Sequence, residues 1–255
     1  MSWTDFIKPS AAVAALVIAT CGVGASAATL VVRSSGPSAK AYPAGKQLAD
    51  NGQIALKAGD QVVILDSKGT RTLKGPGTFS PTVSSNQASD SRETFAQVSS
   101  RRARPGATRG IPPQATAVAP ASTDAARSPN IWFVDVERSA TVCVADPAAV
   151  TLWRPEGGAA GTATLTNVGT GKAGTVQWTQ GQSKAPWPAS LPVSEGARYK
   201  VSWAGQAAPT ELRFALLGAE TAGLEDMASK LITKGCTAQL DMLIEMVAIP
   251  DSPAS

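Results

Sequence analysis

Residues 61–74 read QVVILDSKGTRTLK, and this stretch decides the fold of the first part of the chain. Val62 to Leu65 form an apolar run rich in β-branched side chains, which favour strands. Asp66-Ser67-Lys68-Gly69 has the composition of a turn, and Thr70 to Leu73 then alternates between threonine and longer side chains. The stretch therefore predicts a β-hairpin, whose second strand ends where Gly75-Pro76-Gly77 turns the chain.

Further short strands are expected on the N-terminal side of this hairpin. Thr29 to Arg33 and Ile54 to Lys57 are β-branched or apolar runs, and turns at Gly36-Pro37 and Gly59-Asp60 separate them from their neighbours. Residues 29–80 are therefore predicted to form a small β-module.

The order of these elements resembles the periplasmic β-rich domain of FecR-like proteins. The matching residues are Ile54 to Leu56, Gly59-Asp60, Val62 to Leu65, the D-x-x-G-T turn from Asp66 to Thr70, and Leu73. FecR-like proteins sense an envelope signal and pass it to a cytoplasmic sigma factor, so the resemblance implies a fold and an envelope-sensing context. Only residues 1–10 precede the apolar run in this chain, so the sigma-regulating role is not expected to carry over.

Residues 1–28 have the three parts of an export signal. Lys8 and the amino terminus precede an apolar run from Ala11 to Ala19, and Ala25-Ser26-Ala27 provides a small-residue cleavage site. We therefore expect cleavage near Ala27 or Ala28 and a periplasmic or secreted product. Two alternatives stay open, namely an uncleaved anchor over Ala11 to Val32 and a lipoprotein with Cys21 as the acceptor.

Residues 81–129 have the composition of a linker. They are mostly Ser, Ala, Pro, Arg, Thr and Gln, and such a segment buries too little apolar surface to offset its ordering entropy. One short helix is predicted within Ser89 to Arg104. The basic side chains here are either a solvated tether or a contact for an anionic surface such as lipid headgroups. The candidate contacts for such a surface are Arg101, Arg102, Arg104 and Arg109.

Residues 130–249 predict a second, larger module, followed by a tail at 250–255. Short apolar runs separated by Gly, Pro, Asn and Asp turns suggest an antiparallel β-sandwich. Leu224, Met227, Ala228 and Leu231 then repeat with helical spacing before Gly235, and a second helix is expected from Thr237. The expected fold class is mainly β, with a C-terminal helical hairpin. The predicted strands are Ile131 to Val136, Ala140 to Ala145, Val150 to Trp153, Thr162 to Val168, Thr175 to Thr179, Arg198 to Trp203 and Glu211 to Leu217.

Cys143 and Cys236 are the two cysteines outside the export signal. An even pair in an exported chain favours a disulfide, because that compartment oxidises thiols. The alternative is two separate buried thiols. A bridge would join the turn between the two helices to the second strand of the module.

Histidine is absent from the sequence, which argues against Ser-His-Asp and Cys-His catalysis and against ordinary zinc sites. No lysine follows a serine by three residues, and no phosphate-binding G-x-x-x-x-G-K-[ST] loop occurs. We therefore expect no enzyme activity, cofactor or resident metal. The net charge of +4 conceals a basic first half and an acidic second half, and an exported protein of this kind is not expected to bind nucleic acid.

Carboxylates offer the remaining catalytic alternative. Asp135, Glu137, Asp146 and Glu156 would suit a glycosidase-like pair or a calcium site if they converged, and otherwise they are solvent-facing strand residues.

Tryptophan is concentrated in the second module. Trp132 and Trp153 lie in apolar strands and are expected in the core. Trp187, between Pro186 and Pro188, is expected to be partly exposed, and Trp178 is the next candidate. These two are the candidate contacts for a sugar or peptide ligand.

These observations predict a non-enzymatic, exported binding or sensing protein that acts through a protein or glycan partner of the envelope. A carboxylate-based carbohydrate-active enzyme and a membrane-anchored signalling receptor are the alternatives.

Overall fold

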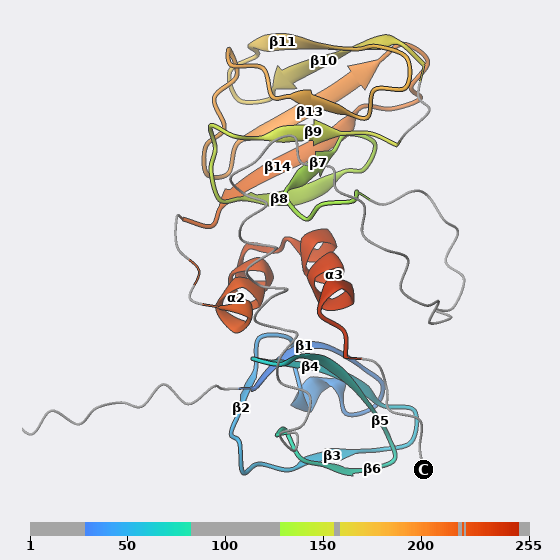
Figure 1. Ribbon diagram of the computed structural model, residues 1–255, viewed down its shortest axis with the longest axis vertical. Helices are drawn as coiled ribbons and strands as arrows, with labels where there is room; N and C mark the ends of the chain where they lie inside the picture. Colours follow the sequence, from blue (N-terminus) through green and yellow to red (C-terminus); the bar gives the residue numbers. More distant parts are fainter. Residues whose placement is uncertain (1–28, 83–127, 156–158, 219–220, 222, 250–255) are drawn as a thin grey trace, which may run out of the picture.

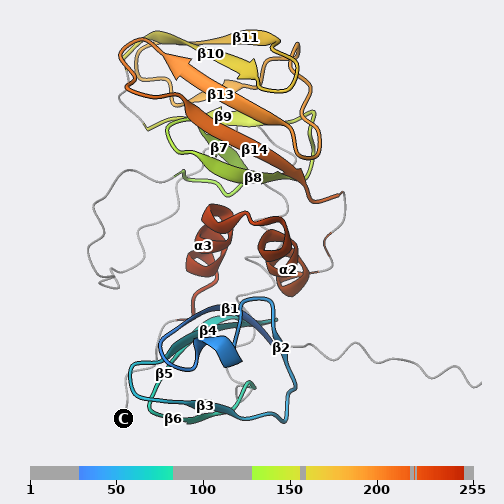
Figure 2. The same ribbon diagram turned by 180° about the vertical axis from the view of Figure 1, so that it is seen from behind.

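The computed structural model describes residues 29–82, 128–155, 159–218, 221 and 223–249. Within them the chain is mainly β, with several small sheets and two C-terminal helices that contact each other. Figure 1, and the opposite view in Figure 2, show the two helices between a smaller group of strands from the first module and a larger group from the second.

The first module contains six strands and one short 3-10 helix, η1, at Ala39–Ala41. Its strands are β1 (Thr29–Ser35), β2 (Gln47–Leu48), β3 (Ile54–Leu56), β4 (Gln61–Asp66), β5 (Gly69–Lys74) and β6 (Gly77–Phe79).

The second module contains eight strands and the helices α2 (Leu224–Lys234) and α3 (Thr237–Met246). Its strands are β7 (Phe133–Asp135), β8 (Ala140–Val144), β9 (Thr151–Trp153), β10 (Gly161–Asn167), β11 (Ala173–Trp178), β12 (Lys184–Pro186), β13 (Arg198–Trp203) and β14 (Thr210–Leu216).

The predicted hairpin is confirmed as β4 and β5, which pair antiparallel from Gln61 opposite Lys74 to Asp66 opposite Gly69. The Asp66 carboxylate accepts hydrogen bonds from the backbone N–H groups of Lys68 and Gly69, which fixes the turn. The hairpin lies in a four-stranded sheet of order β2-β1-β4-β5, and β3 pairs with β6 below it. The short strands β2 and β6 were not predicted: β2 has only two residues, and β6 begins at Gly77, inside the turn expected at Gly75-Pro76-Gly77.

Strand β4 is buried on both of its faces. Val62 and Ile64 point into the core of the first module, whereas Val63 and Leu65 belong to a different apolar cluster that includes the helices. Successive side chains of a strand point to opposite sides, so a run of four apolar residues requires cover on both. The helices provide the second cover.

The larger group of strands forms a five-stranded sheet of order β11-β10-β13-β14-β8 and a three-stranded sheet of order β12-β9-β7. Both sheets contribute to one apolar core, in which Val134 and Leu152 of the smaller sheet join Leu165, Tyr199 and Phe214 of the larger one. All seven predicted strands of this module are confirmed, and β12 is additional.

The pairing of these strands is only partly antiparallel, which corrects the sequence expectation. β14 pairs with β8, and β7 pairs with β9, in parallel register. A local sequence pattern indicates a strand but not the direction of the strand that pairs with it. Whether two strands pair in parallel depends on how the chain between them crosses from one to the other.

Helices α2 and α3 pack against both modules. Leu224, Met227 and Leu231 of α2 are buried in one apolar cluster with Leu30 of β1 and Cys143 of β8. Gly235 ends α2 in the left-handed conformation, as predicted from the sequence. In the described part of the chain, neither helix has the length and apolar composition needed to cross a membrane.

The segment after α3 joins the edge of the first module. The backbone N–H of Thr70 donates to Val247 at 2.9 Å, and that of Ile249 donates to the Thr70 carbonyl at 3.0 Å. Gly69 permits this approach, since a Cβ at that position would lie 2.4 Å from the Val247 carbonyl oxygen. The helical pair, expected to belong to residues 130–249 alone, therefore also completes the module at 29–80.

Candidate functional site

A cavity of about 160 Å³ lies between α3 and the first two strands of the second module. Phe133 and Val142 form part of its apolar wall, and Met242 contributes from the helix. Asp135, Arg138 and Asp241 add charged groups of both signs. An apolar surface with a few converging polar groups is the usual character of a ligand site, which makes this cavity the candidate functional site.

Asp135 is a charged group of the cavity with two close polar partners. It ends β7, and its carboxylate accepts a hydrogen bond from the Glu137 backbone N–H at 2.9 Å. The Arg138 guanidinium lies 3.7 Å away. Burial nevertheless raises the pKa of Asp135 above its ordinary value, because the loss of solvation outweighs these two partners.

Glu137 is coupled to Asp135. Burial and the negative charge of Asp135 raise the pKa of the Glu137 carboxyl, and the charges of Arg154 and Arg138 oppose that rise. The pKa values of these two neighbouring carboxyl groups are therefore both raised, and of the two Asp135 lines the cavity.

Gln239 lines the cavity and closes the outer edge of β8. Its side-chain oxygen accepts the Cys143 N–H at 2.6 Å, and its amide nitrogen donates to the carbonyls of Cys143 and Ile131, each at 2.8 Å. The amide thereby takes the place of a neighbouring strand, a protection that sheet edges need. No sequence pattern indicates this role, because a lone glutamine on a helix resembles any solvent-facing polar residue.

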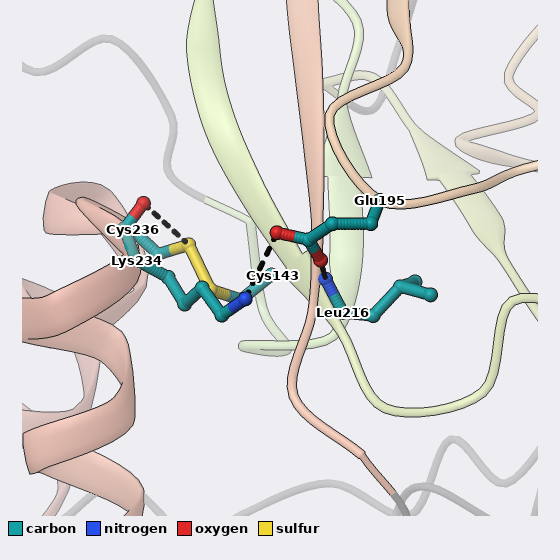
Figure 3. A network of polar contacts seen from close by, with 5 residues as sticks. All are labelled: Cys143, Glu195, Leu216, Lys234 and Cys236. Atoms are coloured by element: carbon teal, nitrogen blue, oxygen red, sulfur yellow. Dashed lines mark hydrogen bonds and ion pairs between the residues drawn. A yellow bond between two sulfur atoms is a disulfide. The ribbon is translucent and has the colours of Figure 1, made fainter.

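The disulfide between Cys143 and Cys236 confirms the predicted pairing, with Cα atoms 5.8 Å apart. It connects β8 to the start of α3, beside Gln239. Figure 3 shows a second link next to it, in which Lys234 Nζ lies 2.8 Å from Glu195 Oε1 and the Leu216 N–H donates to Oε2 at 2.6 Å. The bond from Lys234 and that from Leu216 hold the pKa of Glu195 below its usual value.

The four candidate carboxylates divide into separate places. Asp135 and Glu137 are neighbours, whereas Asp146 is exposed and lies in a turn where it accepts the Ala148 N–H at 2.9 Å. Glu156 lies outside the described residues. Within the described ranges, no group of three or more potential metal-ligating side chains occurs.

The two candidate tryptophans lie in the core of the second module. Trp178 is 3% exposed, with the Arg154 guanidinium 5.4 Å from its ring centroid, so the expectation of an exposed ring there is wrong. Trp187 is half-buried; its Nε1 donates to the Leu191 carbonyl at 2.6 Å, and its ring packs edge-on against Tyr199 and Phe214. A ligand contact at Trp178 or Trp187 stays a prediction. The burial of the Trp178 ring argues against a contact at that residue.

The candidate contacts for an anionic surface, Arg101, Arg102, Arg104 and Arg109, lie outside the described residues, as does the short helix predicted within Ser89 to Arg104.

Comparison of the chain with protein-family models, with curated proteins and with solved structures found no match.

Sequence reasoning missed Arg138, Gln239 and Met242, which the fold brings to one cavity from β8's flanking turn and from α3. Asp135 was named from the sequence only as one of four carboxylates for a glycosidase-like pair or a calcium site, and the structure places it in the lining of this cavity.

Proposed function

We propose that this chain is an exported, non-enzymatic binding or sensing protein, whose partner in the cell envelope engages the cavity between α3 and β7–β8. The observation that carries the proposal is the position of α3. Its first turns line the cavity with Ala238, Gln239 and Met242, while the residues after its last turn pair with Thr70 of the first module. A ligand that moves α3 would alter both modules at once, as a sensor requires.

Export rests on two features of the chain. The disulfide indicates an oxidising location outside the cytoplasm, and residues 1–28 have the composition of a secretion signal. We propose the periplasm as that location, with residues 81–129 as a linker. Sequencing the amino terminus of the mature protein would identify a start near Ala28, and an intact start at Met1 would favour the anchored receptor instead.

The FecR-like assignment of residues 29–80 also belongs to the proposal. It is supported by the order β3, Gly59-Asp60 turn, β4, Asp66–Gly69 turn, β5, which is the order that suggested the resemblance. Asp60 strengthens the first turn by accepting the backbone N–H groups of Ser38 at 2.7 Å and Lys57 at 2.5 Å. We likewise interpret the two sheets around the shared core as a β-sandwich.

Replacing Ala238 with Trp tests the binding role. Ala238 is exposed and lines the cavity, so an indole at this position would occupy the space. Ala208→Trp, in an exposed loop, is the matched control. Each protein is immobilised and incubated with oxidised envelope extract, and bound proteins, glycans and lipids are quantified by mass spectrometry.

We expect at least one species that the wild type and Ala208→Trp retain and Ala238→Trp loses. If every retained species binds all three proteins equally, the cavity is not the binding site.

One observation favours a second candidate function. The raised pKa values of Asp135 and Glu137 suit a general acid in a carboxylate-based carbohydrate-active enzyme. Release of reducing ends from purified peptidoglycan, abolished by Asp135→Asn, would establish that enzyme. The absence of release by the wild type would leave the binding role as the explanation of the cavity.

A further inference from the structure

Two arginines lie directly opposite each other on the outer face of the five-stranded sheet. Arg198 of β13 is the register partner of Arg213 of β14. The Arg198 backbone is bonded away from β14, because its carbonyl accepts the Val168 N–H on the opposite side of β13. The position next to the pair does bond across the two strands, where the Phe214 N–H donates to the Ala197 carbonyl. The arginines therefore occupy a non-hydrogen-bonded pair, the type in which opposing side chains lie closest.

This arrangement costs stability in the free protein. Like charges directly opposite each other in an antiparallel pair repel, whereas the next such pair along the same strands, Lys200 and Glu211, is an ion pair at 3.5 Å. Both arginines are exposed, and Arg198 has no ion pair within the described part of the chain. Two acidic groups near the pair are already engaged: Glu195 by Lys234 and Glu211 by Lys200. The charge of Arg213 acts on Glu195 without an ion pair between them.

The sheet surface around the pair is hollowed. Arg198, Lys200 and Arg213 line a depression of about 490 Å³, together with the hydroxyl-bearing Ser139 and Thr141. One carboxylate, Glu211, also lines it and is paired with Lys200. Guanidinium groups bind phosphate and sulfate through two parallel N–H bonds, and an anion between two of them would turn their repulsion into attraction.

We propose that Arg198 and Arg213 form a binding site for an oxyanion group, a phosphate or sulfate carried by a ligand or a lipid headgroup. The site borders the cavity at β8, but its charged residues come from β13 and β14, so it does not depend on the role proposed for the cavity.

Thermal unfolding with inorganic phosphate tests the site, using sodium chloride to hold the ionic strength constant. The wild-type melting temperature should rise with phosphate concentration, because a ligand that binds the folded state stabilises it. Arg213→Thr should melt above the wild type without phosphate and should bind phosphate at least about tenfold more weakly, since bonds to charged groups are the strong ones. Lys172→Thr, in an exposed turn, removes one positive charge elsewhere and should respond like the wild type.

The proposal is overturned if phosphate stabilises Arg213→Thr as much as it stabilises Lys172→Thr, or if it stabilises neither protein nor the wild type.

Co-sedimentation with vesicles distinguishes the two sources of the anion. Binding of the wild type to phosphatidylglycerol vesicles but not to phosphatidylcholine vesicles, lost in Arg213→Thr and kept in Lys172→Thr, would identify a lipid headgroup. Phosphate stabilisation without vesicle binding would identify a soluble phosphate-bearing ligand. Vesicle binding that Arg213→Thr retains in full would contradict a lipid role for the pair.

Discussion

Asp135 combines partial burial with close polar partners, and the balance between them governs how its charge affects the fold. Burial raises its pKa, so the folded state favours the neutral form. Ionisation therefore costs stability at a pH above the folded-state pKa, and this cost disappears below the ordinary aspartate pKa of about 3.9. The isosteric amide avoids the cost and keeps an oxygen for the Glu137 N–H.

We predict that Asp135→Asn raises the melting temperature at pH 7 and that its advantage over the wild type vanishes as the pH falls toward 3. Thermal scans across this pH range check the prediction. Asp146→Asn, at an exposed position, is the control and should stay within about 0.5 kcal/mol of the wild type. An Asp135→Asn variant less stable than the wild type at pH 7 would mean that the Arg138 contact outweighs burial.

Gln239 shows that one side chain can determine whether an edge is stable. Replacing it with Leu leaves three buried backbone groups without their partner, at a cost of about 1–3 kcal/mol for each unpaired group. We predict that Gln239→Leu loses about 3 kcal/mol in urea unfolding. Gln177→Leu, on an exposed position of β11, should lose less than about 0.5 kcal/mol, and equal losses in the two variants would contradict the role of the amide.

At the scale of elements, the disulfide fastens the turn between α2 and α3 to β8. It closes a loop with a sequence separation of 93, for which the chain-entropy model gives a stabilisation of about 4.6 kcal/mol. We predict that the double variant Cys143→Ala, Cys236→Ala loses that amount in urea unfolding, and that dithiothreitol lowers the stability of the wild type by a similar amount. The reductant should leave the double variant unchanged; an equal effect on both proteins would show that it acts elsewhere.

Most helices and strands could be predicted from the sequence, whereas the strands and helices that each one packs against could not. Val62 to Leu65 and the Asp66–Gly69 turn specified a hairpin because all of its contacts are local. Gly235 specified the end of α2 for the same reason. The parallel pairing of β8 with β14 joins residues far apart in the chain, and the cavity beside it depends on where α3 packs, which no local pattern encodes.

At the scale of the whole molecule, the helices make the two modules one structure within the described residues. Their shared apolar cluster contains Leu30, Val32, Val63 and Leu65 from the first module, and the Arg33 guanidinium forms an ion pair with Asp241 of α3. The unbroken run Val62 to Leu65 contained this information, because a strand with one exposed face would alternate. The sequence did not identify the helices as the elements that cover the second face of β4, because any helix with an apolar face could do so.

The apolar contact between the helices and the first module predicts a single cooperative unfolding transition. Each module would expose apolar surface if the other unfolded. Val63 is 8% exposed and faces the helices, while its neighbour Val62 faces the inner core of the first module. A lysine at position 63 places a charge in the apolar contact between β4 and the helices. It leaves the core of the first module, which contains Val62, intact. We therefore expect calorimetry to resolve one transition for the wild type and two for Val63→Lys, with Gln61→Lys, at an exposed position of the same strand, retaining one. Two transitions in the wild type would mean that the helices contribute too little to couple the modules, and the route from cavity to first module through α3 would then have no mechanical basis.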